Sequence, residues 1–174
     1  MKLFKKLAAV VLVAVLAAGM LAGCSGAPAA PNTPLPSDAE ALALYQGVSE
    51  TCTRYNVKTP VYAAELEPIA QEIAEAAEIH RYYTTQPSAA VIDKAKTDVS
   101  ALADGAEYLV YDLNPYDAAV KTPLSVTSMK NTIIQKGANR MGIVIVTLTN
   151  VDTKEEVKYE CTVYARFPDA AAQE

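Results

Sequence analysis

The chain has 174 residues, enough for one domain and an export signal, and its 15 basic and 20 acidic side chains give a net charge of −5. This acidic balance disfavours nucleic acid and anionic lipid headgroups as partners. One His and three Cys are too few for a zinc site, and the seven glycines include no Gly-rich phosphate loop. We therefore predict no metal and no cofactor.

Residues 1–23 have the pattern of a secretory signal peptide. Three lysines precede an uncharged apolar run, and small residues stand before Cys24. The run Leu21-Ala22-Gly23-Cys24 is closely similar to a bacterial lipobox, which implies cleavage before Cys24 and acylation of its thiol. An uncleaved membrane helix is the alternative, but the apolar run is short for a span. We expect a lipid-anchored protein at the extracytoplasmic face of the cell membrane.

A proline-rich linker follows, over residues 24–37. Its core, SGAPAAPNTPLP, contains four prolines and small residues that favour an extended chain. We expect the folded domain over residues 38–168 and a disordered tail over 169–174. Removal of residues 1–23 leaves 12 basic and 20 acidic side chains, so the mature chain carries a charge of −8.

Cys52 and Cys161 remain once Cys24 is lipidated. Two thiols in an exported protein favour one disulfide between them. It would close a loop of more than a hundred residues, worth roughly 4–5 kcal/mol in the chain-entropy model. Two buried thiols are the alternative.

Helical periodicity dominates the first part of the domain. A capping box of Ser37 and Glu40 predicts a first helix over 38–55, with Cys52 on its apolar face. A second helix is predicted over 65–81, with Pro68 in its first turn and His80 near its end. A third helix begins at Pro87-Ser88 and stops at Gly105.

The second part of the domain is richer in strand patterns. Residues 107–113 read as a short strand, and Thr122-Pro123 opens a short helix to about Gln135, which Gly137 ends. The run 141–149 is apolar on both faces, as in a central strand covered from both sides. Residues 156–167 alternate, with Cys161 on the inward face. Helices followed by a terminal antiparallel hairpin predict an α+β layered domain.

The order and spacing of these segments resemble the CAP superfamily of secreted domains (cysteine-rich secretory, antigen 5, pathogenesis-related). The segments that carry the resemblance are Leu66-x-x-x-Ala70-x-x-x-Ala74, the apolar pair Ile133-Ile134, Gly142-Ile143-Val144-Ile145 and the aromatic end of the last strand, 164–167. It covers most of residues 40–167 and implies a three-layer α-β-α sandwich.

In the CAP family, the cleft carries two His and two Glu that can bind a divalent metal. This chain departs from the family at those positions. Met129 stands where one His is expected, and His80 lies earlier than the other. Glu107 corresponds to the glutamate of the family's G-E-N motif, although Ala106 intervenes. The resemblance therefore implies a degenerate cleft without a metal.

Glu107 and four tyrosines are the candidate residues of a ligand groove, against the alternative that the tyrosines only pack in the core and its rim. The tyrosines are Tyr82, Tyr83, Tyr108 and Tyr111. His80 is the only imidazole that a Ser-His-Asp arrangement could recruit, and a boundary position in the core explains it better.

The sequence favours a non-catalytic binding or scaffold module for an envelope lipid, peptide or polymer, attached to the membrane through the lipid on Cys24. One alternative is an enzyme, a wall-directed hydrolase that uses an acid such as Glu107 or Asp112. Another is an accessory subunit of a membrane complex.

Overall fold

The computed structural model describes residues 34–119 and 130–168. Several predicted features lie outside the described residues: the signal peptide 1–23, Cys24, most of the linker, the first part of the helix expected to end near Gln135, and the tail 169–174. Within the described ranges, no helix has the length and apolar character needed to cross a membrane.

A mixed four-stranded sheet forms the centre of the domain, with strand order β1-β5-β6-β4. Strands β5 (Arg140–Thr149) and β6 (Glu156–Arg166) form the predicted antiparallel hairpin, and β4 (Glu107–Pro115) pairs antiparallel with β6. Strand β1 (Val61–Tyr62) is short and runs parallel to β5. The C-terminal strand therefore lies between two others.

The first helix, α2 (Ala39–Arg54), is confirmed, but its predicted capping box is wrong. Asp38, not Ser37, caps the helix: its carboxylate accepts hydrogen bonds from the backbone N–H groups of Glu40 and Ala41, at 2.9 and 2.8 Å. Asp38 is one of the strongest N-cap residues, and it also places its negative charge at the positive end of the helix dipole.

The second helix is shorter than predicted. A 3-10 turn, η2 (Ala64–Leu66), leads into α3 (Glu67–Glu75), with Pro68 in the first turn as expected. The chain then forms a two-stranded ribbon of β2 (Glu78–Ile79) and β3 (Thr84–Thr85). His80 consequently lies in the turn of this ribbon and not in a helix.

The third helix, α4 (Ala89–Leu102), starts after Ser88 as predicted. Gly105 follows it with a positive φ of 76°, in the turn that leads to β4. β4 is longer than the predicted strand over 107–113 and continues through Asn114 and Pro115, because both pair with β6. The short helical segment η3 (Lys130–Gln135) is a π-helix, and Gly137 with φ 72° ends it as expected.

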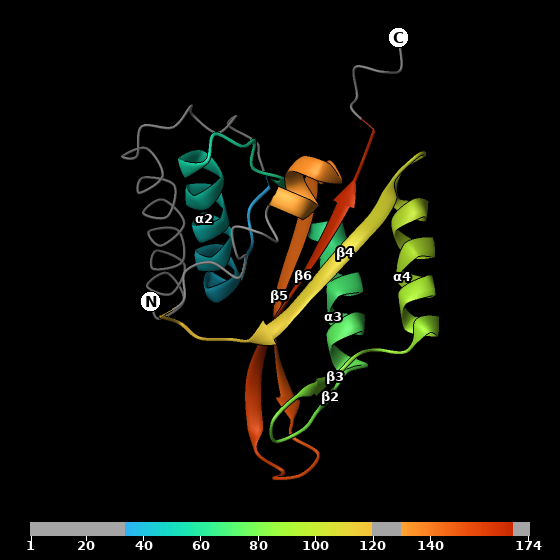
Figure 1. Ribbon diagram of the computed structural model, residues 1–174. Helices are drawn as coiled ribbons and strands as arrows, with labels where there is room; N and C mark the ends of the chain where they lie inside the picture. The colour runs from blue at the N-terminus through green and yellow to red at the C-terminus, as the bar shows by residue number, and fades with distance from the viewer. Residues whose placement is uncertain (1–33, 120–129, 169–174) are drawn as a thin grey trace, which may run out of the picture. The chain divides into compact units, whose positions relative to one another are not determined.

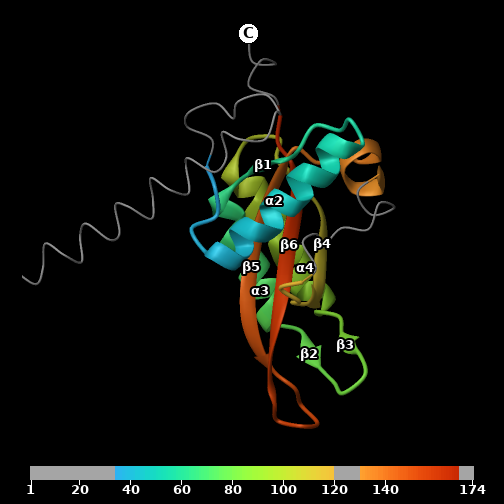
Figure 2. The same cartoon turned by 90° about the vertical axis from the view of Figure 1, so that its left-hand side faces the viewer.

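Helices cover both faces of the sheet (Figures 1 and 2), and two separate cores result. The α2-side core contains the apolar residues of α2 together with Ile133, Met141, Ile143 and Tyr164. The α3-side core contains the apolar residues of α3 and α4 together with Cys161 and Val163. The predicted mixture of helices and a sheet is confirmed, and coverage of both faces explains why residues 141–146 of β5 are all apolar.

Gly142 allows the start of α3 to approach β5 closely. A Cβ atom at this position would lie 2.5 Å from Leu66 Cβ and 2.9 Å from its carbonyl carbon. The chain can therefore turn away from the sheet directly after β1, which pairs only with Arg140 and Met141 of β5. Among the described residues, no strand pairs with this side of β5 between Met141 and the bridge of Ile79 to Asn150 at the end of the strand.

Candidate functional site

The structure does not bring the predicted groove residues together. Glu107, the first residue of β4, is exposed, and its carboxylate forms an ion pair with the Arg166 guanidinium of β6. Tyr108 and Tyr111 are half-buried against the α3-side core, and the Tyr111 hydroxyl donates to Gln86 Oε1. Tyr111 lies four residue steps from Glu107 along the strand, about 13 Å at about 3.3 Å per step.

Tyr82 and Tyr83 lie in the turn of the β2–β3 ribbon and are 82% and 64% exposed. The Arg81 guanidinium lies 5.2 Å from the Tyr82 ring centroid, and Tyr83 stacks on His80 at 4.8 Å. The ribbon is at one end of the molecule, whereas β4 begins at the other (Figure 1). These tyrosines therefore cannot share a groove with Glu107.

His80 joins the ribbon to the β5–β6 turn. Its Nδ1 lies 3.4 Å from Asp152 Oδ2, and its Nε2 lies 3.7 Å from Glu78 Oε2. The backbone N–H of Arg81 donates to the same Asp152 carboxylate at 3.0 Å, and this bond is the main cause that lowers its pKa. Within the described part of the chain, no group of three or more His, Cys, Asp or Glu is arranged to hold a metal ion.

The expected Cys52–Cys161 disulfide is not present. Both residues are buried as predicted, but Cys52 belongs to the α2-side core and Cys161 to the α3-side core, on opposite faces of the sheet. The apolar face of α2, which carries Cys52, and the face of β6 that carries Cys161 thus point into two different cores. Burial raises the pKa of the Cys161 thiol to about 12 and also raises that of Cys52, so neither is an activated nucleophile.

A cluster of polar residues lies between β4 and β6 on the α2 side of the sheet. We call it the β4–β6 polar cluster. Asp112 is opposite Thr162 in the strand register, and Asn114 is opposite Glu160. Tyr164, two residues from Thr162 on the same face, completes it. Glu160, Thr162 and Tyr164 are 5%, 0% and 0% exposed.

The cluster disfavours negative charge. Burial raises the pKa of Glu160 to about 7, although a hydrogen bond from Asn114 opposes the shift. Burial also raises the pKa of Asp112, which the nearby Lys136 partly offsets. Within the described residues, three buried oxygens of the cluster have no hydrogen-bond partner: Asp112 Oδ2, Thr162 Oγ1 and Tyr164 Oη. Such a group of oxygens can hold protons or accept bonds from a donor.

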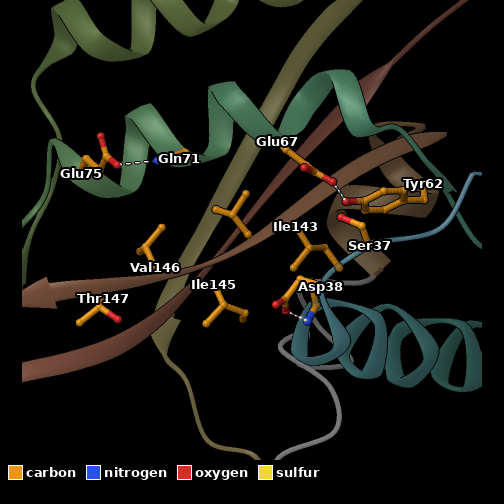
Figure 3. Close-up of a pocket in the computed structure, with 12 residues that line it drawn as sticks. Ser37, Asp38, Tyr62, Glu67, Gln71, Glu75, Ile143, Ile145, Val146 and Thr147 are labelled. Atoms are coloured by element: carbon orange, nitrogen blue, oxygen red, sulfur yellow. Dashed lines mark hydrogen bonds between the residues drawn. The ribbon is translucent and has the colours of Figure 1, made fainter. Parts of the chain in front are cut away.

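A second feature, which the sequence did not suggest, is a cavity of about 380 Å³ along the open side of β5 (Figure 3). We call it the edge groove. The α2 end contributes Ser37, Asp38 and Ala41. The α3 wall and its neighbours contribute Tyr62, Glu67, Gln71 and Glu75, and the floor is Ile143–Thr147 of β5.

The floor of the edge groove offers backbone hydrogen-bonding groups. Ala63 donates to the carbonyl of Met141, so this odd-numbered residue of β5 points its backbone groups away from β6. Backbone groups alternate sides along a strand. Ile143, Ile145 and Thr147 therefore direct theirs into the groove, at positions where no described strand pairs with them.

The walls of the edge groove carry acidic and neutral polar side chains. Its lining includes three acids, Asp38, Glu67 and Glu75, and no Lys or Arg. The Tyr62 hydroxyl donates to Glu67 Oε1, and Gln71 Nε2 donates to Glu75 Oε1 at 2.7 Å (Figure 3). The i, i+4, i+8 spacing of Glu67, Gln71 and Glu75 is visible in the sequence and places them on one face of the helix. They line a groove only because this face lies beside the open side of β5.

A second cavity, of about 420 Å³, lies at the other end of α2, between the residues that follow that helix and η3. Its lining includes Val57, Ile133 and Ile134, with Tyr55 at its rim. Apart from Lys58, its lining carries no charged side chain. This second cavity is more apolar than the edge groove. Its lining has no row of backbone and acidic groups like that of the edge groove.

Comparison with known proteins adds no relative: no family model, no curated protein and no solved structure matches this chain.

Proposed function

We propose that this protein is a lipid-anchored extracytoplasmic module that binds a polypeptide partner in the edge groove, without catalysis. The Lys-rich start, the apolar run and the lipobox-like residues before Cys24 support export and anchoring. The observation that supports binding is the open side of β5, where unpaired backbone groups line a cavity between two helices. Added strands use such edges for recognition.

We further propose that the domain is a CAP-like three-layer sandwich with a degenerate cleft. The helices on both faces of the sheet and the element order support this assignment. Leu66, Ala70 and Ala74, the residues of the L-x-x-x-A-x-x-x-A pattern, are all fully buried. His80 lies in the β2–β3 ribbon, remote from the start of β4, which fits a cleft without the family's histidines.

Site-specific photocrosslinking in living cells tests the binding role. A photoreactive amino acid at Thr147, an exposed residue of the groove floor, should give protease-sensitive adducts of higher mass. The same amino acid at Thr97, exposed on α4, is the matched control. Equal adducts at both sites, or adducts that proteases do not remove, would contradict a polypeptide ligand in this groove.

Anchoring has its own test. The mature chain should fractionate with membranes and carry acyl groups detectable by mass spectrometry, whereas Cys24→Ala should abolish both. If Cys24→Ala remains acylated and membrane-bound, the anchor lies elsewhere.

A wall-directed hydrolase is the second candidate, and the β4–β6 polar cluster is the observation that favours it. Half-buried Asp112 and buried Glu160 are neighbouring acids with raised pKa values, a condition that general acids require. Glu107 is less suited because it is exposed and paired with Arg166. Release of soluble fragments from purified cell wall, lost in Asp112→Asn and kept in Glu107→Gln, would support this candidate over the first.

A further inference from the structure

We propose that the partner segment is basic and extended, and that it joins the sheet as an added strand beside β5, with Lys or Arg at positions i and i+4 facing α3. This inference rests on the proposed function, because it specifies the ligand of the same groove. Three observations lead to it: the directed backbone groups of β5, the spacing of acids on α3, and the absence of basic residues from the groove lining.

Backbone pairing determines the conformation of the ligand. By the alternation that starts at Met141, Ile143, Ile145 and Thr147 each direct one N–H and one C=O to the groove side, in a pattern that an extended chain matches. The residues between them, Val144 and Val146, pair with Cys161 and Tyr159 of β6. An extended segment of about five residues would satisfy the open groups, because strands advance at about 3.3 Å per residue.

The acids on α3 determine the charge and spacing of the ligand. Glu67 and Glu75 are eight residues apart, which corresponds to about 12 Å along a helix. Side chains at i and i+4 of a strand lie about 13 Å apart on the same face. In Figure 3 these glutamates follow one another along α3 beside β5, with Gln71 between them. Two basic side chains four residues apart therefore match them, and residue i+2 lies opposite the Gln71 amide.

A second copy of the chain is the less suitable occupant. Edge-to-edge pairing of two β5 strands would bring the acidic walls of both copies together, either α3 against α3 or α3 against the Asp38 end of α2. Like charges that meet in this way oppose association. A second copy would also bring its own helices to this edge of the sheet.

The test uses the full chain with Cys24→Ala and three synthetic probes. The first is a nine-residue extended peptide of alternating Thr and Val with Lys at positions 3 and 7. The second carries Glu at both positions, and the third keeps Lys but has N-methyl groups on alternate amides, prepared in both registers. Fluorescence anisotropy measures binding, and amide hydrogen exchange locates it.

We expect the Lys peptide to bind and the Glu peptide to bind at least tenfold more weakly. Only one register of N-methylation should abolish binding, because only one set of amides faces β5. The amides of Ile143, Ile145 and Thr147 should gain protection from exchange, whereas those of Val144 and Val146 should not change. Glu75→Gln should weaken binding about two- to fivefold, the range for an exposed ion pair.

Glu72→Gln is the matched control for charge, because Glu72 is on the same helix but pairs with Lys94 of α4 at 2.7 Å. It should leave the affinity unchanged. Equal binding of the Lys and Glu peptides, or of both N-methylated registers, would overturn the added-strand inference. A stable dimer in sedimentation, or binding that appears only after deletion of residues 25–33, would assign the groove to another occupant and equally overturn it.

These outcomes are separate from failure of the proposed function. Crosslinks at Thr147 that stay at the level of Thr97 would remove the binding role itself. Strong Thr147 crosslinks together with no preference for the Lys peptide would keep the binding role and remove the basic added strand.

Discussion

Gly142 lies under the first turn of α3, so close that a Cβ atom there would come within 2.5 Å of Leu66 Cβ. This approach has two effects on the domain. It packs the start of α3 directly on β5, and it takes the chain away from the sheet after the two residues of β1. The open side of β5, and with it the edge groove, follows from a residue without a side chain.

Gly142→Ala should therefore destabilise the domain. The added methyl group meets the backbone of Leu66 as well as its side chain, and overpacking of this kind typically costs about 1–3 kcal/mol. Urea unfolding followed by circular dichroism measures the loss. Thr149→Val, at an exposed position of the same strand, should change the free energy of unfolding by less than about 0.5 kcal/mol. Similar values for both variants would contradict the close packing.

The cap of α2 gives a second prediction. Asp38→Ala removes the side chain that accepts from two backbone N–H groups, and should cost about 0.5–2 kcal/mol. Ser37→Ala should have little effect because Ser37 is not the cap. Thermal unfolding of both variants distinguishes them, and a larger loss for Ser37→Ala would restore the capping box expected from the sequence.

Glu160 gives a prediction on pH. Its pKa is about 7 in the folded chain and 4.5 as the reference value, so the folded state binds its proton more tightly than the unfolded state. The contribution of Glu160 to the free energy of unfolding is therefore greatest below about pH 4.5. This contribution is lost as the pH rises through about 7. Asp112 has a raised pKa as well and acts with the same sign.

Glu160→Gln should remove most of this dependence and stabilise the chain at pH 8 by roughly 1–3 kcal/mol, since a neutral amide has no charge to bury. Unfolding by urea at pH 5 and pH 8 measures the change. Glu156→Gln, at an exposed position of β6, serves as the control. A wild-type chain more stable at pH 8 than at pH 5, with Glu160→Gln unchanged, would contradict the raised pKa.

The separation of the cysteines gives a fourth prediction. In the Cys24→Ala chain, iodoacetamide should leave Cys52 and Cys161 unmodified in the native state, because both are buried with raised pKa values. After denaturation without reductant, mass spectrometry should find both modified. A disulfide would leave both unmodified until a reductant is added, and that result would contradict their placement on opposite faces of the sheet.

Much of the fold could be predicted from periodicity. The apolar spacing of α2 and α4, the continuous apolar run of β5 and the alternation of β6 each reflect a local pattern that burial imposes. The end of α3 could not be predicted in this way. Ala76, Ala77 and Ile79 continue a helical pattern, but pairing of Ile79 with Thr84 and a bridge to Asn150 favour a strand there.

The site was less predictable, because it depends on which face of the sheet each residue meets. Glu160 and Thr162 occupy polar positions of an alternating strand. If only one face of the sheet were covered, these residues would be exposed. In this sheet, with helices on both faces, they are 5% and 0% exposed instead. The same two-sided coverage separates Cys52 from Cys161, because a buried side chain of such a sheet can lie in the core on either face. The edge groove depends on where β1 stops, which no local pattern in residues 61–63 specifies.

The position of the last strand has a consequence for how the chain folds as it emerges from a ribosome. β6 lies between β5 and β4 and contributes side chains to both cores. Every helix in residues 34–119 and 130–168 emerges before it, yet none can bury its apolar face fully until residue 167 is available. The domain must remain unassembled for nearly its whole length and then close in one late step, so any product that stops before β6 should be a substrate for proteases instead of a smaller folded protein.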